Sequence, residues 1–418
     1  CEAICTYGEA NFLILLLKFS YFLIFIFLYG KMSSKLNLKE YINRMKTVLI
    51  FYASYGGGHL SAAKSIRDCI LENYKEIDVH LVDCMKYINK GIEKITTTAY
   101  KEMAKKAPWA WGKVYYQSQK GPLAHISSSS NKIMAHKLNK LIEDVKPDLI
   151  ISTHPFANQM CSYLKKKCKI TAKIATIMTD YAPHDQWLVG SEFIDYFFVA
   201  HEGMKEQLIQ KGIPQTKIYA TGIPLSNRFL LNYNKEETLK HFGLKSDKKT
   251  VLFFGGGEFG LGKSKTLEIL KALLEDFNNI QIVAISGKNL KMKKSFETLV
   301  KENKKEDEVT ILEYTNEVPE LMSISDLVIT KPGGLTTTES LASGLPIVVI
   351  NPIPGQEEEN AEFLQKKQVG IWLKKGMNVK ETLNDLFNSP SKMQEMKIHA
   401  RLLAKKNSTK DICKVLFS

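Results

Sequence analysis

Residues 47–59 read TVLIFYASYGGGH, and this stretch decides the fold. Its first seven residues form a continuous apolar run, as expected for a strand that is buried on both faces of a parallel sheet. Three glycines follow, and in residues 59–74 the apolar positions recur at helical spacing. A strand, a glycine loop and a helix in this order indicate the start of a doubly wound α/β domain.

The same alternation of strands and helices continues along the chain and then starts again at residues 250–254, TVLFF. The sequence therefore predicts an α/β fold with two tandem doubly wound, Rossmann-like parallel-sheet domains facing across a cleft. We place the domains at residues 46–224 and 225–390, with TGIP at 221–224 as the junction. The other expected strands lie at 78–82, 148–152, 173–178, 197–200, 281–286, 309–312, 326–330 and 346–350.

The composition favours an anionic partner and argues against a metal centre. The 418 residues carry a formal net charge of +14, which attracts nucleic acid, anionic lipid headgroups or phosphorylated metabolites. The seven cysteines are scattered without CxxC spacing or a Cys/His cluster, as expected in a reducing cytosol.

Residues 1–45 are an apolar extension that precedes the folded pattern. Residues 12–29 are almost entirely apolar and barely long enough to span a membrane. A membrane anchor is one interpretation; a signal peptide fits poorly because no small-residue cleavage site follows. We favour upstream sequence before a start at Met32 or Met45, outside the mature protein, because the folded pattern begins only at Lys46.

Residues 86–120 interrupt the α/β pattern with eight lysines, two glutamates and six Trp or Tyr residues. Basic residues mixed with aromatic rings are typical of membrane-interface helices, so we expect this insert to contact an anionic membrane surface. The alternative is a solvated helical insert with a few core aromatics. The expected membrane contacts are Lys105, Lys106, Trp109, Trp111 and Tyr115.

The glycine loop after the first strand is a candidate acceptor or phosphate site. Gly56, Gly57 and Gly58 let backbone N–H groups approach a ligand, and the next helix presents its positive end. The loop lacks the GxGxxG and GK[ST] patterns, so it predicts neither a dinucleotide site nor a P-loop. A neutral His59 could take a proton from an attacking hydroxyl, although a capping or packing histidine is the alternative.

A second glycine turn, KPGGLTTTES at 331–340, follows the expected strand at 326–330. Lys331 and the turn at Gly333 and Gly334 could face a phosphate, with Thr336 capping the next helix. Glu339 could accept both hydroxyls of a ribose; a capping glutamate is the alternative.

Two further polar segments follow buried strands. In PIPGQEEEN at 352–360, Gln356 and Glu357 could bind sugar hydroxyls, whereas Glu358 and Glu359 fit an acidic first helical turn. In MTDYAPHDQW at 178–187, a structural network is an alternative to a catalytic role for its polar residues. The remaining candidates are Asp180 and His184 for the acceptor or for proton chemistry, and Asn360 and Gly257 for the donor.

Taken together, YGGGH, MTDYAPHDQW, TGIP, KPGGLTTTES and PIPGQEEENA resemble the diacylglycerol glycosyltransferases. These include bacterial processive diacylglycerol β-glucosyltransferases and plant monogalactosyldiacylglycerol synthases, and they are related to the lipid II-forming N-acetylglucosaminyltransferase. The resemblance covers the chain from about Lys46 to its end.

The resemblance implies a GT-B fold and an inverting, metal-independent transfer of a hexose, with glucose favoured, from a UDP-sugar to diacylglycerol. It places the donor in the second domain and the lipid in the first, at the cytoplasmic face of a membrane. It also implies that the helices of residues 391–418 return to the first domain. No cofactor and no nucleic acid are expected, and no oligomeric state follows.

The resemblance also assigns roles to residues. Glu339 would bind the ribose, Gln356 and Glu357 the sugar, and Thr336 with the Gly333–Gly334 turn the diphosphate. His59 would act as base or phosphate contact, with Asp180 as the second choice for the base. A polyprenyl-linked acceptor with UDP-N-acetylglucosamine, a UDP-sugar 2-epimerase and a non-catalytic nucleotide-sugar sensor remain alternatives.

Overall fold

The computed structural model describes residues 47–120, 122–255 and 262–418, apart from some side chains in the helices between residues 90 and 145. The chain divides into two compact units, of which Thr47–Leu416 contains every contact discussed below. The expected N-terminal extension at residues 1–45 and the donor candidate Gly257 lie outside the described residues.

The first domain is built on a six-stranded sheet in the order β2-β1-β3-β4-β5-β6. All of its neighbouring strands are parallel. The apolar run that opens the fold is an interior strand of this sheet, because β1 pairs with β2 on one side and β3 on the other. The strands are β1 (Thr47–Tyr52), β2 (Asp78–Asp83), β3 (Leu149–Ser152), β4 (Lys173–Ile177), β5 (Tyr196–Phe198) and β6 (Ile218–Tyr219).

The second domain repeats this plan with a parallel sheet in the order β12-β11-β10-β7-β8-β9. The strands are β7 (Lys249–Phe254), β8 (Ile280–Ile285), β9 (Val309–Leu312), β10 (Leu327–Thr330), β11 (Ile347–Val349) and β12 (Gly370–Trp372). Two tandem doubly wound sheets confirm the predicted fold class. The edge strands β6 and β12 were not predicted, because β6 has only two residues and β12 begins with a glycine, so neither shows a continuous apolar run.

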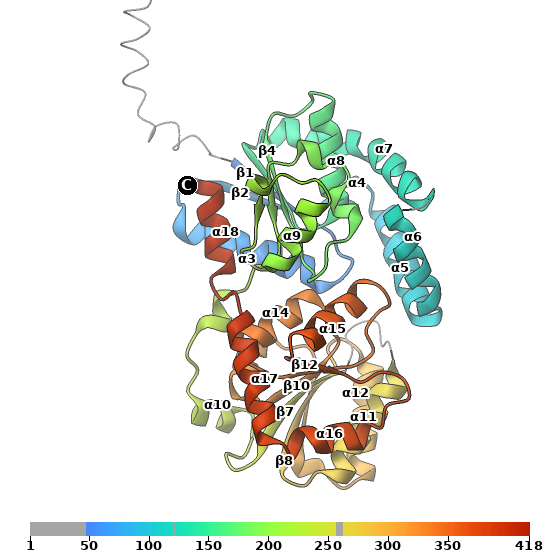
Figure 1. Ribbon diagram of the computed structural model, residues 1–418, viewed down its shortest axis with the longest axis vertical. Coiled ribbons are helices and arrows are strands. Elements are labelled where there is room, and N and C mark those ends of the chain that lie inside the picture. The colour runs from blue at the N-terminus through green and yellow to red at the C-terminus, as the bar shows by residue number, and fades with distance from the viewer. Residues whose placement is uncertain (1–46, 121, 256–261) are drawn as a thin grey trace, which may run out of the picture. The chain divides into compact units, whose positions relative to one another are not determined.

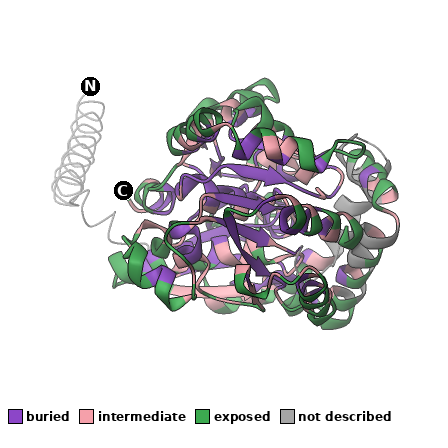
Figure 2. Cartoon of the chain, turned by 90° about the horizontal axis from the view of Figure 1, so that it is seen from below, coloured by how far each residue is buried: buried purple, intermediate pink, exposed green. Residues whose placement is uncertain are grey.

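Helices cover the sheets, and the strands form the buried centre of each domain in Figure 2. The helices of the first domain are α3 (Gly57–Asn73), α4 (Cys84–Ile88), α5 (Lys90–Lys106), α6 (Pro108–Lys120), α7 (Pro122–Val145), α8 (Pro155–Lys166) and α9 (Glu202–Gln210). Those of the second are α10 (Lys235–His241), α11 (Lys263–Asp276), α12 (Leu290–Glu302), α13 (Val318–Ile324), α14 (Gly334–Ala342), α15 (Gln356–Lys366) and α16 (Val379–Phe387).

The chain ends with α17 (Pro390–Leu403) and α18 (Ser408–Phe417). Helix α17 packs on α14 and α16 of the second domain, whereas α18 lies beside α3 of the first (Figure 1). The Thr409 hydroxyl donates to the Leu225 carbonyl at 2.7 Å and accepts from the Leu225 N–H at 2.8 Å. The last two helices therefore contact both domains.

Two helices start earlier than the sequence suggested. Helix α3 begins at Gly57, so His59 lies in its first turn. Helix α14 begins at Gly334 with Gly333 as its N-cap and no side-chain cap, so the expected capping role of Thr336 is wrong. Glycine at position 334 lets α14 start inside its loop, close to the opposite domain.

Candidate functional site

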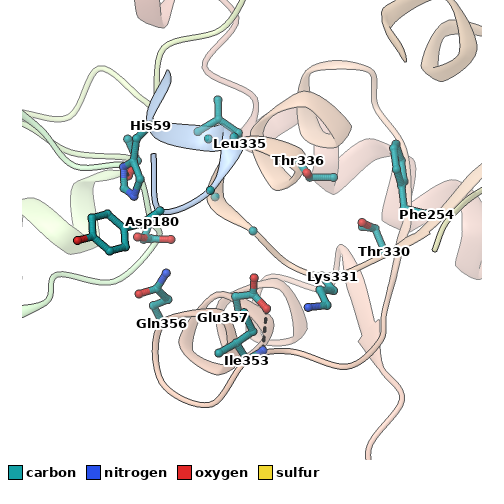
Figure 3. A pocket seen from close by; sticks show the side chains of 17 residues that line it. His59, Asp180, Phe254, Thr330, Lys331, Leu335, Thr336, Ile353, Gln356 and Glu357 are labelled. Carbon is teal, nitrogen blue, oxygen red and sulfur yellow. Dashed lines mark hydrogen bonds between the residues drawn. The ribbon is translucent and has the colours of Figure 1, made fainter. Parts of the chain in front are cut away.

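A cavity of about 300 Å³ lies at the carboxyl ends of the strands of both sheets (Figure 3). The loops after β1 and β10 enter it from opposite domains, next to the points where the strand order of each sheet reverses. Such switch points are where doubly wound sheets bind ligands. The cavity is lined by Tyr55, Gly56, Gly57, Gly58, His59, Thr179, Asp180, Phe254, Thr330, Lys331, Gly333, Gly334, Leu335, Thr336, Ile353, Gln356 and Glu357.

The glycine loop carries the cavity wall of the first domain. Gly56 has φ of +144°, which favours glycine, and the 17-residue helix α3 follows with no acidic residue in its first turn. A β-carbon on Gly58 would lie 3.3 Å from Cδ2 of Leu335 on α14. The N-terminal ends of α3 and α14 therefore meet at the cavity, and both present a positive partial charge there.

His59 is held in one tautomer by the backbone of the loop after β3. Its Nδ1 lies 2.6 Å from the Thr153 carbonyl oxygen, which can only accept, so Nδ1 carries the proton. The Thr153 hydroxyl in turn donates to the His59 carbonyl at 2.9 Å. Burial lowers the pKa of His59 to about 4, so the ring is neutral at pH 7 and Nε2 keeps its lone pair.

Asp180 lies beside His59 in Figure 3, across the cavity from the loop that carries Lys331. Burial raises its pKa to about 6, and a hydrogen bond from Asn360 Nδ2 at 3.2 Å opposes this rise. His59 and Asp180 are therefore both available as proton acceptors near neutral pH, with different pKa values.

The turn after β10 carries the wall of the second domain. A β-carbon on Gly334 would lie 1.8 Å from the carbonyl oxygen of Thr179, so only glycine allows this approach of the two domains. Lys331 lines the same turn; burial lowers its pKa, and the nearby Glu357 carboxylate opposes this. Lys331 is the lysine among the described lining residues that could face a phosphate group.

The floor of the cavity comes from the start of α15. Gln356 is its first residue, and Glu357 Oε2 accepts from the Ile353 N–H at 2.7 Å. Burial raises the pKa of Glu357, while Lys331 acts in the opposite direction. Glu358 accepts from the Gly355 N–H at 3.1 Å, which satisfies one free donor at the start of α15, so it serves the helix start, as expected for an acidic first turn.

Asn360 lies outside the lining and bridges the domains. Its Oδ1 accepts from the Tyr181 N–H at 2.8 Å, and its Nδ2 donates to Pro332 O at 2.9 Å as well as to Asp180. Tyr181 reaches into the second domain, where its hydroxyl lies 3.0 Å from Thr338 Oγ1 and its ring packs on Phe363. These contacts hold Asp180 in place; a direct role of Asn360 in donor binding stays a prediction.

Two other predicted residues do not line the cavity. Glu339 is three residues after Thr336, hence on the same face of α14, and burial raises its pKa to about 8. Among the described residues, no hydrogen bond or ion pair reaches its carboxylate. His184 caps the short helix that follows it by accepting from the Gln186 N–H at 3.1 Å, as expected for a structural role.

The expected membrane contacts lie on α5 and α6, and the structure describes the side chain of one of them. Trp109 is 74% exposed, and Tyr116, seven residues later on the same helix, is exposed as well. The side chains of Lys105, Lys106, Trp111 and Tyr115 lie outside the described residues. Over the described ranges, no helix has both the length and the apolar character needed to cross a membrane.

Sequence reasoning missed the residues that surround His59. Thr153 and His154 follow β3, in the stretch STHP, and polar residues directly after a buried strand are a signal that could have identified them. Thr179, whose hydroxyl lies 3.1 Å from His59 Nδ1, was quoted in a motif without a role. In the part of the chain that the structure describes, no group of three or more His, Cys, Asp or Glu side chains could hold a metal.

Comparison with known proteins places these features in a family. A family model described as monogalactosyldiacylglycerol (MGDG) synthase matches residues 59–225, and one for glycosyl transferases group 1 matches residues 234–403. A processive diacylglycerol beta-glucosyltransferase of Bacillus pumilus is 31% identical over 89% of this chain and 94% of its own. The protein of the same name from Staphylococcus epidermidis is 32% identical over 90% and 93%.

Solved structures share the fold at lower identity. MurG of Acinetobacter baumannii is 15% identical, with a TM-score of 0.59 over 88% of this chain and 98% of its own. A UDP-GlcNAc 2-epimerase from Neisseria meningitidis bound to UDP-GlcNAc is 16% identical, with a TM-score of 0.59 over 89% and 99%. These likenesses show the fold alone, whereas the identity to the curated relatives shows that the chain belongs to the family of the processive diacylglycerol beta-glucosyltransferases.

Proposed function

We propose that this protein transfers glucose from UDP-glucose to the hydroxyl of diacylglycerol or of a glycosyl-diacylglycerol, with inversion and without a metal. The observation that carries the proposal is the meeting of two glycine turns, one from each domain, around His59, Asp180 and Lys331. The names of the curated relatives support the substrate class.

The cavity suits a departing nucleoside diphosphate. The N-terminal ends of α3 and α14 converge there without acidic residues in their first turns, and Lys331 adds a cation. Fixed N–H groups and a cation aimed at developing charge can stabilise the leaving phosphate. Gln356 and Glu357 lie on the opposite side of the cavity from His59, and in this proposal they contact the sugar.

His59 is the proposed base, because the Thr153 carbonyl fixes its proton on Nδ1 and leaves Nε2 to accept one. The acceptor hydroxyl would give its proton to Nε2 as its oxygen attacks the sugar carbon and the diphosphate leaves. Asp180 is the second candidate for the base, and its different pKa allows an experiment to distinguish it from His59.

The pH dependence of kcat/KM should distinguish the two bases. Either group works only when deprotonated, so the rate falls as pH drops through its pKa. With His59 as base we expect little loss between pH 7 and 5 and a fall near pH 4. A fall centred near pH 6 would favour Asp180 instead. Circular dichroism at each pH would exclude unfolding as the cause.

The lipid acceptor is the proposed reason for the insert at residues 90–120. The insert carries the exposed Trp109 together with exposed lysines, including Lys90, Lys94 and Lys113. This combination is complementary to an anionic lipid surface. The proposal therefore includes peripheral attachment to the cytoplasmic face of a membrane.

Replacing Trp109 with alanine should weaken binding to vesicles that contain an anionic lipid by about tenfold, because one interfacial indole is lost. Sedimentation with vesicles measures this, and binding should also fall as salt rises. Tyr314→Ala, which removes an exposed ring from the second domain, is the matched control. Equal binding of both variants would argue against docking through α6.

The transfer assay tests the function itself. The full chain is given diacylglycerol in anionic micelles with UDP-glucose, UDP-galactose or UDP-N-acetylglucosamine, with and without EDTA. The expected result is a glucolipid whose formation resists EDTA. Turnover of UDP-N-acetylglucosamine without lipid would favour an epimerase. Transfer to a polyprenyl-linked acceptor alone would favour an N-acetylglucosaminyltransferase. UDP binding with no turnover on any substrate would favour a nucleotide-sugar sensor.

A further inference from the structure

The α5–α6 insert touches the candidate site at two separate points. One contact reaches the glycine loop of the first domain, and the other reaches the loop before α15 in the second domain. The two loops form facing walls of the cavity. An insert that served only to contact a membrane would need neither of these contacts with the cavity loops.

The first contact joins Tyr55 to α5. Tyr55 Oη lies 2.7 Å from Thr96 Oγ1, and Thr96 Oγ1 itself donates to the Glu93 carbonyl at 3.2 Å. Because a threonine hydroxyl has one proton, Tyr55 is the donor in the bond between them. The position of the Tyr55 ring, which lines the cavity, is therefore set from the insert.

Tyr55 is connected to His59 through packed rings. Its ring stacks on His154 with centroids 5.4 Å apart and an interplanar angle of 24°. His154 meets His59 edge-on at 4.7 Å. Since close-packed rings have little room to move independently, a displacement of Tyr55 is passed to His154 and then to His59.

The second contact joins α6 to the donor side. A β-carbon on Gly112 would lie 2.9 Å from Cβ of Pro354, so the α6 backbone rests directly on this proline. Pro354 precedes Gln356 and Glu357 by two and three residues, and it belongs to the same loop. A proline ring cannot swing away as a flexible side chain would.

We propose that Thr96 and Gly112 are positioning residues. They hold the cavity wall that carries His59 and the wall that carries Gln356 and Glu357 at the separation that transfer needs. Thr96 acts on His59 through Tyr55 and His154, and Gly112 acts on Gln356 and Glu357 through Pro354. The inference rests on the proposed glycosyltransferase function for its kinetic consequences, but its structural core can be measured without turnover.

For the first contact the test combines Thr96→Val, which keeps the shape, with Tyr55→Phe, which keeps the ring. Each single variant should lower kcat about tenfold, with the Kd for UDP unchanged. The double variant should lose no more than either single variant, about tenfold in total relative to the unmodified protein. Thr96→Ser should restore the rate. Thr98→Val, an exposed position on the same helix, is the control. A hundredfold loss in the double variant, or no loss in any, would overturn the proposal.

Imidazole NMR spectra give a readout that does not need activity. Thr96→Val should shift the ring resonances of His59 and His154, whereas Thr98→Val should not. Unchanged spectra in Thr96→Val would overturn the first contact. If the unmodified protein makes no glycolipid, the proposed function is wrong. The NMR spectra would still show whether Thr96 positions His154 and His59.

For the second contact the test is Gly112→Ala. Alanine is the better helix former by about 0.5–1 kcal/mol, so α6 should persist while its new methyl group pushes Pro354 away. The Kd for UDP-glucose should rise about fivefold to tenfold, with the Kd for UDP unchanged, because only the sugar side moves. Equal affinities of Gly112→Ala and the unmodified protein for UDP-glucose would overturn the role of Gly112.

Discussion

Replacing His59 with alanine is expected to lower kcat by about 10²- to 10⁴-fold, the usual contribution of a positioned general base, while UDP still binds. The reason is the fixed tautomer: with Nδ1 donating to the Thr153 carbonyl at 2.6 Å, Nε2 is the nitrogen that can receive the acceptor proton. No other imidazole among the described residues lines the cavity. Single-turnover kinetics and calorimetry of UDP binding measure the two quantities separately.

The control for this prediction is Asp180→Asn, which has nearly the same shape but cannot accept the proton as a carboxylate. If His59→Ala kept a near-normal rate and Asp180→Asn lost it, the base would be Asp180. Melting temperatures are needed for both, since His59→Ala removes the hydrogen bond from Nδ1 to the Thr153 carbonyl and Asp180→Asn changes the acceptor of the hydrogen bond from Asn360.

Replacing Glu339 with alanine is expected to weaken UDP binding by about 1–3 kcal/mol, or roughly five- to 150-fold in Kd. Its carboxylate lies on the same face of α14 as the cavity-lining Thr336, and burial raises its pKa to about 8. Two ribose hydroxyls donating to it would favour the charged form, so UDP binding should release a proton. The affinity should therefore rise between pH 6 and 8.

Glu339→Gln separates these effects, because glutamine keeps the length of the side chain but cannot titrate. This variant should lose the part of the pH dependence that belongs to Glu339, while the part that belongs to the nucleotide's own phosphates remains. Unchanged UDP affinity in Glu339→Ala would move the ribose contact to another residue of the second domain.

The architecture could be predicted because its central strands are fully buried and therefore continuously apolar. The runs at β1 and β7 identify the two sheets, and the glycine turns after β1 and β10 mark their ligand-binding ends. These are local signals. The exact helix starts at Gly57 and Gly334 were missed, since a glycine before a helix does not show where the first turn begins.

The network around the site could not be predicted, because it depends on contacts between distant segments. Tyr181 and Asn360 are 179 residues apart, and nothing in either motif shows that one hydrogen-bonds the other. The same holds for Tyr55 and Thr96, which join a loop to an insert of different composition. Sequence motifs identified which loops line the cavity, whereas the tertiary structure shows which of their side chains face it and which are held by hydrogen bonds.

The approach of Gly334 to the Thr179 carbonyl has a consequence for how fast spent nucleotide leaves. Backbone meets backbone there, so the two domains cannot come closer at this point, and we expect spent nucleotide to leave as they separate. Separation breaks the hydrogen bonds of Tyr181 to Asn360 and Thr338, each worth about 0.5–1.5 kcal/mol, and exposes the tyrosine ring. We expect the residence time of UDP to depend on these two hydrogen bonds, so that weakening them would shorten it without altering the chemical step.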